Sequence, residues 1–229
     1  LRASIVVPYQ DADLAAAEID RLGADRRFVQ VLLLARTVEP LGRRRFWKIY
    51  EAAARHDLPI GIHFGGSGGM PFTGAGRPSF YLEDHCGMSQ AFQAQVISLV
   101  CEGVFEHFST LKVVLIEGGF AWLPPLMWRL DRSWRRLREE VPHLRELPSH
   151  YIRRHFWLTT QPMEEPSRPE YFVQLLDQLG MNERLLFATD YPHWDFDAPD
   201  QAFPAKIPAT LEQRVLAGNA RALYRLTGE

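Results

Sequence analysis

Ionisable and polar side chains stand at the ends of several apolar segments of this 229-residue sequence. His63 closes LPIGIH, Glu117 closes LKVVLIE, Asp190 closes RLLFATD, and Gln161 follows HFWLTT. An imidazole and a carboxylate are ligand types that suit zinc or a similar first-row divalent ion. A group at the end of a buried segment is also partly desolvated, so its neighbours can tune its pKa. The pattern therefore favours metal chemistry with acid–base assistance.

Along the sequence, apolar segments typical of strands alternate with amphipathic segments typical of helices. Apolar segments rich in β-branched residues predict strands at residues 4–7, 28–34, 58–64, 111–117, 155–160 and 184–190. Amphipathic segments between them predict helices at residues 12–22, 44–56, 89–107, 122–140, 169–179 and 210–226. This alternation is typical of βα units around a parallel sheet. In an α/β barrel the carboxyl ends of the strands meet at one rim, where we expect the polar groups to converge.

Two long loops follow predicted strands and are candidate covers for a site at that rim. One is GGSGGMPFTGAGRPSFYLEDH, residues 65–85, and the other is QPMEEPSRPE, residues 161–170. The first loop ends at His85, and the segment DYPHWD places His193 three residues after Asp190. We expect His85, His193 and Gln161 to contact substrate. No GxSxG motif is present, which disfavours a serine hydrolase.

Length, net charge and cysteine content limit the kinds of molecule that the protein is expected to bind. The length suits one domain over residues 1–229, and a formal net charge of −2 gives no global reason to bind nucleic acid or an anionic membrane. We therefore expect a small-molecule substrate. Two cysteines suggest neither a disulfide scaffold nor a metal knuckle, and the amino-terminal segment lacks the order of a signal peptide, so a cytoplasmic location is predicted.

Five stretches carry a family resemblance over almost the whole sequence. They are LPIGIHFGG, FSTLKVVLIEGGFAWLPPLMWRLD, PSHYIRRHFWLTTQPMEEP, LLFATDYPHWDFD and VLAGNARALYRL. They resemble the amidohydrolase-related family that also contains aminocarboxymuconate-semialdehyde decarboxylase and the resorcylate decarboxylases. The resemblance implies a (β/α)8 TIM barrel with one divalent metal, usually zinc, at its mouth.

In that family the metal is held by a His-x-His or Glu-x-His pair on the first strand, a His on the fifth and an Asp on the eighth. His63 matches the fifth-strand ligand and Asp190 the eighth-strand ligand, whereas the first-strand pair has no match. Counting back from these matches makes residues 4–7 the third strand. The resemblance therefore implies an incomplete barrel with the equivalents of strands 3–8, lacking the first one or two βα units.

The sequence departs from the decarboxylases at the end of the sixth strand. The decarboxylases resemble one another in carrying a proton-handling His there, and this sequence has Glu117. That difference favours a metal-dependent hydrolase of a small carboxylated, amide or lactone substrate, with Asp190 and Glu117 as catalytic residues. The alternatives are a metal-dependent decarboxylase, and a non-catalytic barrel module without a functional metal site.

Three tryptophans recur along the segment 122–140, namely Trp122, Trp128 and Trp134. Their spacing inclines them to one side of the predicted helix, where they would pack against the barrel or a loop. An exposed aromatic stripe would instead suit a homodimer contact, so a homo-oligomer, a dimer, is our expectation.

Overall fold

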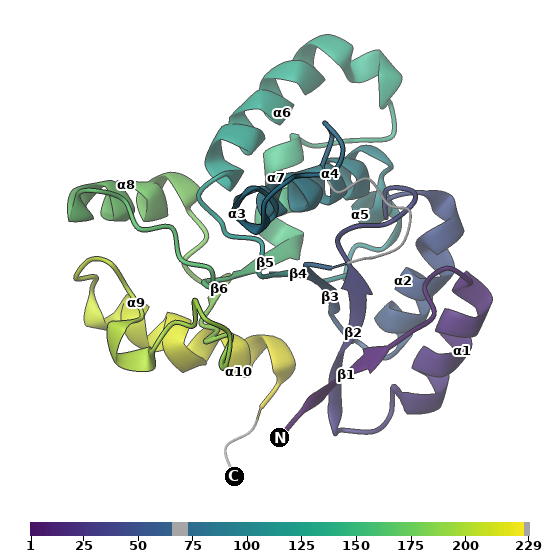
Figure 1. The fold of residues 1–229 in the computed structure, drawn as a ribbon. Helices are drawn as coiled ribbons and strands as arrows, with labels where there is room; N and C mark the ends of the chain where they lie inside the picture. Colours follow the sequence, from purple (N-terminus) through teal and green to yellow (C-terminus); the bar gives the residue numbers. More distant parts are fainter. Residues whose placement is uncertain (66–72, 227–229) are drawn as a thin grey trace.

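The computed structural model describes residues 1–65 and 73–226, and within them the strands form one six-stranded parallel sheet (Figure 1). The strands are β1 (Ala3–Val6), β2 (Phe28–Leu34), β3 (Ile60–His63), β4 (Val113–Ile116), β5 (Phe156–Thr159) and β6 (Leu185–Leu186). Each pairs with the next along the chain, so β1 and β6 are the edges of the sheet. The predicted α/β architecture of incomplete-barrel type is confirmed.

The connections are mostly helical. They contain α1 (Ala12–Leu22), α2 (Trp47–Arg55), α3 (Tyr81–Cys86), α4 (Met88–Cys101), α5 (Val104–His107), α6 (Leu123–Leu137), α7 (Pro148–His155), α8 (Pro169–Leu179), α9 (Ala209–Gln213) and α10 (Asn219–Tyr224). Short 3-10 turns lie at Arg44–Phe46, Arg138–Glu140 and Pro199–Gln201, and a π-helical turn, η4, lies at Arg214–Gly218. Helix α1 begins where the Asp11 side chain accepts hydrogen bonds from the backbone of Asp13 and Leu14.

Several element boundaries differ from the sequence predictions. The helix predicted over residues 89–107 is divided into α4 and α5, because Gly103 adopts a left-handed conformation with φ +75°. The helix predicted over residues 210–226 is interrupted by η4. Helices α3 and α7 were not predicted. Strand β6 is two residues long, shorter than the predicted strand 184–190, so Asp190 lies four residues beyond the end of β6.

The two faces of the sheet bury different side chains. Val113 and Leu115 of β4 belong to the larger core, to which α1, α2, α4, α6, α7 and α8 contribute. Val114, between them in sequence, points to the other face, as the alternation of strand side chains requires. There a smaller buried cluster forms from Val114, Trp157, Leu186 and Leu223.

Leu223 brings α10 onto this second face, and hydrogen bonds fix its end. The Tyr224 hydroxyl donates to Oε1 of Gln30 on β2 at 2.8 Å, and the Arg225 guanidinium pairs with Asp57 at 2.7 Å. Through Leu223 and Tyr224, α10 therefore links the cluster on β4, β5 and β6 to β2.

Among the described residues, no helix is both long and apolar enough to cross a membrane. The cytoplasmic location stays a prediction. Of the three tryptophans expected to share one side of a helix, Trp122 donates to the Gly118 carbonyl at 2.7 Å and Trp134 lies under Arg138. Trp128 is 55% exposed. The homodimer also stays a prediction.

Gln95 of α4 fastens the segment after β2. Its buried amide donates to the Ala35 carbonyl and accepts from the Leu41 backbone N–H, both at 2.7 Å. We predict that Gln95→Leu lowers the free energy of unfolding by about 2–4 kcal/mol, because it leaves both backbone groups buried without partners. Urea denaturation measures the change.

The matched control is Gln90→Leu, at an exposed position on the same helix. It should change the free energy of unfolding by less than about 0.5 kcal/mol. Equal effects of the two substitutions would contradict the role given to Gln95.

Candidate active site

The strand-end residues predicted from the sequence converge in the structure. His63 ends β3 and Glu117 directly follows β4, and Nε2 of His63 lies 3.0 Å from Oε2 of Glu117. The Glu117 carboxylate also shares a hydrogen bond with the Asp190 carboxyl group. Nδ1 of His193 lies 2.7 Å from Oδ2 of Asp190. A chain of four ionisable side chains therefore crosses this end of the sheet.

The backbone at both carboxylates is in an uncommon conformation. Glu117 and Asp190 have φ angles of +60° and +55°, in the left-handed region that side chains with a Cβ rarely adopt. Such residues cost of order 1 kcal/mol each and cluster at functional sites. The Thr159 hydroxyl at the end of β5 accepts a hydrogen bond from the Glu117 N–H at 3.0 Å, which helps to hold the conformation.

Gly119 completes the turn after β4. Its φ angle is +61°, and a Cβ at this position would collide with the Glu164 carboxylate. That carboxylate accepts hydrogen bonds from the N–H groups of Phe120 and Ala121 at 3.0 and 3.1 Å, just before α6 begins. Glycine is required here because the Glu164 carboxylate approaches so closely.

The two carboxylates have opposite pKa shifts. Burial, together with the hydrogen bond to Glu117 and its negative charge, raises the pKa of Asp190 to about 6. Burial alone would raise the pKa of Glu117, but hydrogen bonds from His63 and Asp190, with the charges of His63 and His193, lower it. The hydrogen bond to Glu117 raises the pKa of His63. Below about pH 6 the carboxylate pair therefore holds a proton, mainly on Asp190.

The donor atoms of this group suit a metal ion. Glu117, Asp190 and His193 each offer one ligand atom, and these atoms lie within 4.8 Å of one another. His63 is hydrogen-bonded to the same Glu117 carboxylate. A mixture of imidazole and carboxylate donors fits zinc, manganese or a similar divalent ion. The sequence analysis named His63 and Asp190 as ligands, and the position of His193 beside Asp190 came from the structure.

A second polar group faces this cluster across a cavity of about 90 Å³. Nε2 of His85 and Nε2 of Gln161 both lie 3.1 Å from Oδ2 of Asp195, which they hold between them. Oε1 of Gln161 is buried and has no hydrogen-bond partner among the described residues. His85, Gln161 and His193, the three residues expected to contact substrate, all line this cavity together with Glu117 and Asp190.

Helix α3, which the sequence analysis did not predict, carries His85 to the cavity. It also contributes Tyr81 and Asp84 to the cavity wall. Asp84 pairs with Arg36, whose side chain is 6% exposed and stacks over the Phe64 ring at 4.3 Å. The spacing of Tyr81 and His85, one helical turn apart, was the signal available in the sequence.

The two loops expected to cover the site are described unequally. Residues 66–72 of the first loop lie outside the described residues. The second loop supplies Gln161 to the cavity and Glu164 to the turn before α6.

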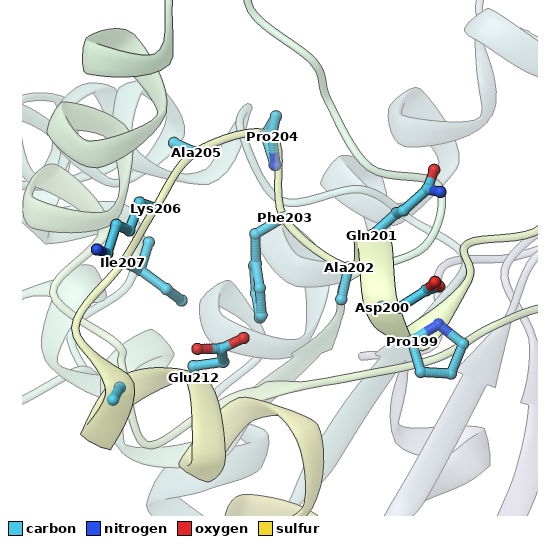
Figure 2. A pocket seen from close by; sticks show the side chains of 11 residues that line it. Pro199, Asp200, Gln201, Ala202, Phe203, Pro204, Ala205, Lys206, Ile207 and Glu212 are labelled. Atoms are coloured by element: carbon cyan, nitrogen blue, oxygen red, sulfur yellow. The ribbon is translucent and has the colours of Figure 1, made fainter.

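A larger cavity, of about 410 Å³, lies elsewhere, along the segment 199–207 (Figure 2). In Figure 2 the Phe203 side chain points from this segment toward Glu212 at the start of the carboxyl-terminal helices. Its lining residues include no His or Cys, and its charged groups are Asp200, Lys206 and Glu212. This cavity is larger than the one that Glu117 and Asp190 line, but the grouped ionisable residues lie at the strand ends.

Comparison with known proteins places this geometry in a family context. The family model described as amidohydrolase matches residues 1–226. A curated γ-resorcylate decarboxylase of Polaromonas sp. strain JS666 is 26% identical over 98% of the chain and 70% of its own length.

Solved structures show the same fold. A 2,6-dihydroxybenzoate decarboxylase from Rhizobium has a TM-score of 0.75 at 21% identity, covering 99% of this chain and 72% of its own. A dihydroxybenzoic acid decarboxylase from Polaromonas, solved with bound manganese and the inhibitor 2-nitroresorcinol, has a TM-score of 0.75 at 21% identity. The match covers 100% of this chain and 70% of that structure.

We predict that Asp190 in the metal-free protein titrates near pH 6, because it is buried beside a second carboxylate. Carboxyl-carbon NMR measures the pKa, and Asp25, whose pKa Arg27 lowers to about 2, provides a reference in the same spectra. Glu117→Gln should lower the pKa of Asp190 by removing the neighbouring charge. An unchanged pKa in that variant would contradict the proposed coupling.

The raised pKa of Asp190 also determines the direction in which the free energy of unfolding changes with pH. Between about pH 4 and pH 6 the folded protein retains a proton on Asp190 that the unfolded chain, with an ordinary pKa of 3.8, has lost. The contribution of Asp190 to stability therefore falls as pH rises through this window. The difference in unfolding free energy between wild type and Asp190→Asn should change across it and be constant above it.

Proposed function

Because the chain belongs to the amidohydrolase family, we propose that it is a metal-dependent decarboxylase of small hydroxylated aromatic carboxylic acids. The observation that carries the proposal is the cluster of His63, Glu117, Asp190 and His193 at the strand ends. The named relatives support decarboxylation, since the curated matches are γ-resorcylate decarboxylases that span 98–99% of the chain.

We assign the metal ligands to His63 and Asp190, with His193 as a third protein group. Three protein ligands and an open position are the usual arrangement of a catalytic zinc site. The bound ion would polarise the substrate carboxylate and its neighbouring oxygen as a Lewis acid. Manganese is as suitable as zinc, because a manganese-containing relative shares the fold.

The proton required by decarboxylation would come from the carboxylate pair. When the bond between the ring and the carboxylate breaks, its electron pair stays on the ring carbon, and carbon dioxide leaves. That carbon must take up a proton, and Glu117 lies at the cavity with its side chain 13% exposed. Desolvation favours its protonated form once His63 turns from Glu117 to another partner.

The opposite wall of the cavity would orient the substrate. The unpartnered Oε1 of Gln161 can accept a hydrogen bond from a substrate hydroxyl. His85, held by Asp195 and in contact with the rings of Tyr81 and Trp194, would contact the substrate from α3. An aromatic substrate suits a wall that also contains Phe64.

Hydrolysis remains the second candidate. The sequence analysis favoured it because Glu117 occupies the place of a histidine that the decarboxylases share. In that reaction Asp190 would accept a proton from an attacking water. The named relatives favour decarboxylation instead. A third candidate, a module without a functional metal site, is separated from both by metal content.

We predict that purified protein loaded with Zn²⁺ or Mn²⁺ retains about one ion per chain after gel filtration. His63→Ala, Asp190→Ala and His193→Ala should each reduce the metal content, because each removes a ligand. His150→Ala, which removes an exposed imidazole on α7, is the matched control and should retain the wild-type content. Absence of metal in wild type would support the non-catalytic module.

We predict that metal-loaded protein converts 2,6-dihydroxybenzoate or a related hydroxybenzoate to the decarboxylated phenol, followed by chromatography. Glu117→Gln should lower kcat by about 100-fold or more, because the amide cannot deliver a proton. Glu139→Gln, an exposed substitution in the turn after α6, should leave kcat unchanged. Turnover of lactones or amides without any decarboxylation would overturn this proposal in favour of hydrolysis.

A further inference from the structure

A cavity of about 560 Å³ lies at the opposite end of the sheet from the proposed active site. Lys112 and Arg184, which line it, directly precede β4 and β6, whereas Glu117 follows β4. Five residues of extended chain separate Lys112 from Glu117 by about 16 Å. This cavity is therefore distinct from the cavity that contains Glu117. The η4 turn and α10 form its other wall, through Arg214, Gly218, Asn219, Ala222 and Leu223.

Arg184 is the central cation of this cavity. Its guanidinium stacks over the Trp157 ring at 3.8 Å from the ring centroid, and Trp157 itself is 8% exposed. Burial lowers the pKa of Arg184, so the charge is partly desolvated. In the described parts of the chain, no carboxylate lies within ion-pair distance of this guanidinium. A half-buried cation held on an aromatic floor is available to an anion that enters the cavity.

Other cations surround it. Lys112 and Arg214 line the same cavity, and their carboxylate partners are Asp57 at 2.8 Å and Glu183 at 2.6 Å. An adjoining cavity of about 400 Å³ shares Glu183, Arg184 and Arg214 and adds Arg153. Arg225 also pairs with Asp57. Positive groups thus exceed negative ones here, although the whole protein carries a formal charge of −2.

The wall that carries Arg214 is built by an unusual turn. Residues Arg214–Gly218 form a π-helical turn. This conformation is rare in proteins overall, and where it occurs it is often part of a functional site. The buried Asn219 amide fastens the end of this turn by donating to the carbonyls of Asn182 and Leu185, both at 2.8 Å. Arg214 and Arg184 are thereby presented from two rigid elements.

From these observations we propose that this cavity binds a small molecule through a phosphate group. Guanidinium groups recognise phosphate through paired N–H donors, and Arg184 and Arg214 supply two of them with Lys112 as a third cation. The volume is within the range of small-molecule sites. A concave site with few cations does not suit a nucleic-acid strand or a membrane surface. The proposal is independent of the reaction assigned to the other end of the sheet.

The test is titration of the protein with inorganic phosphate at constant ionic strength, adjusted with sodium chloride, and followed by calorimetry and tryptophan fluorescence. Saturable binding is expected, with a fluorescence change that disappears in Trp157→Phe. Arg184→Gln and Arg214→Gln should each weaken binding at least tenfold. Arg214 is exposed, so its substitution tests the site with little risk to folding.

Arg44→Gln is the matched control, because Arg44 also stacks over an indole, that of Trp47 at 4.7 Å, on an exposed surface. It should bind phosphate as wild type does. Absence of saturable binding in wild type, or equal binding in the Arg44, Arg184 and Arg214 variants, would overturn the proposal. Saturation by citrate but not by phosphate would overturn the assignment to a phosphate group.

Discussion

Contact between two half-buried carboxylates, Glu117 and Asp190, is the constraint on which the site depends. Two negative charges at this separation repel each other, so one proton or a cation must lie with them. Below about pH 6 a proton lies on Asp190, and His63 forms a hydrogen bond with Glu117. His193 balances Asp190 from the other side. A divalent ion would satisfy the same electrostatic requirement.

The backbone holds this pair together at some energetic cost. Both residues adopt left-handed conformations, Glu117 directly after β4 and Asp190 four residues after the end of β6. The turn that follows Glu117 is fixed by Gly119 and the Glu164 carboxylate, and the Glu117 N–H is fixed by Thr159. Strain at the reacting groups is therefore maintained by hydrogen bonds from the next strand and the next loop.

The sequence predicted the sheet well because its strands are short apolar segments, and those from β3 to β6 are buried on both faces. Helices α1 and α8 were predicted at their observed bounds because their apolar stripes run over three turns. Helices α3 and α7 escaped prediction, since six to eight residues give too little periodicity to identify. His155, the first residue of the strand predicted at residues 155–160, ends α7 instead. It is 3% exposed and stacks on Phe105, a contact that only the tertiary structure creates.

In the candidate site, the residues at the strand ends were predictable from the sequence, and the pairings made by loop residues were not. His63, Glu117, Gln161 and Asp190 follow strands, so the rule that carboxyl ends of parallel strands share a rim brought them together. The pairing of His193 with Asp190, and of His85 with Asp195, depends on how loops turn back over that rim. Sequence spacing does not determine those turns. The arrangement of Arg184 over Trp157 likewise joins residues from neighbouring strands whose register the sequence does not state.

The position of α10 has a consequence for the order of folding. Every strand pairs with the strand next to it in the chain, so the sheet can grow progressively during synthesis. Its second face, however, is covered by Leu223 and Tyr224 from the carboxyl-terminal helix, and the hydrogen bond from Tyr224 to Gln30 joins residues 194 positions apart. Until that helix is made, Val114, Trp157 and Leu186 remain uncovered. This apolar face is therefore covered late in synthesis, after all six strands have been made.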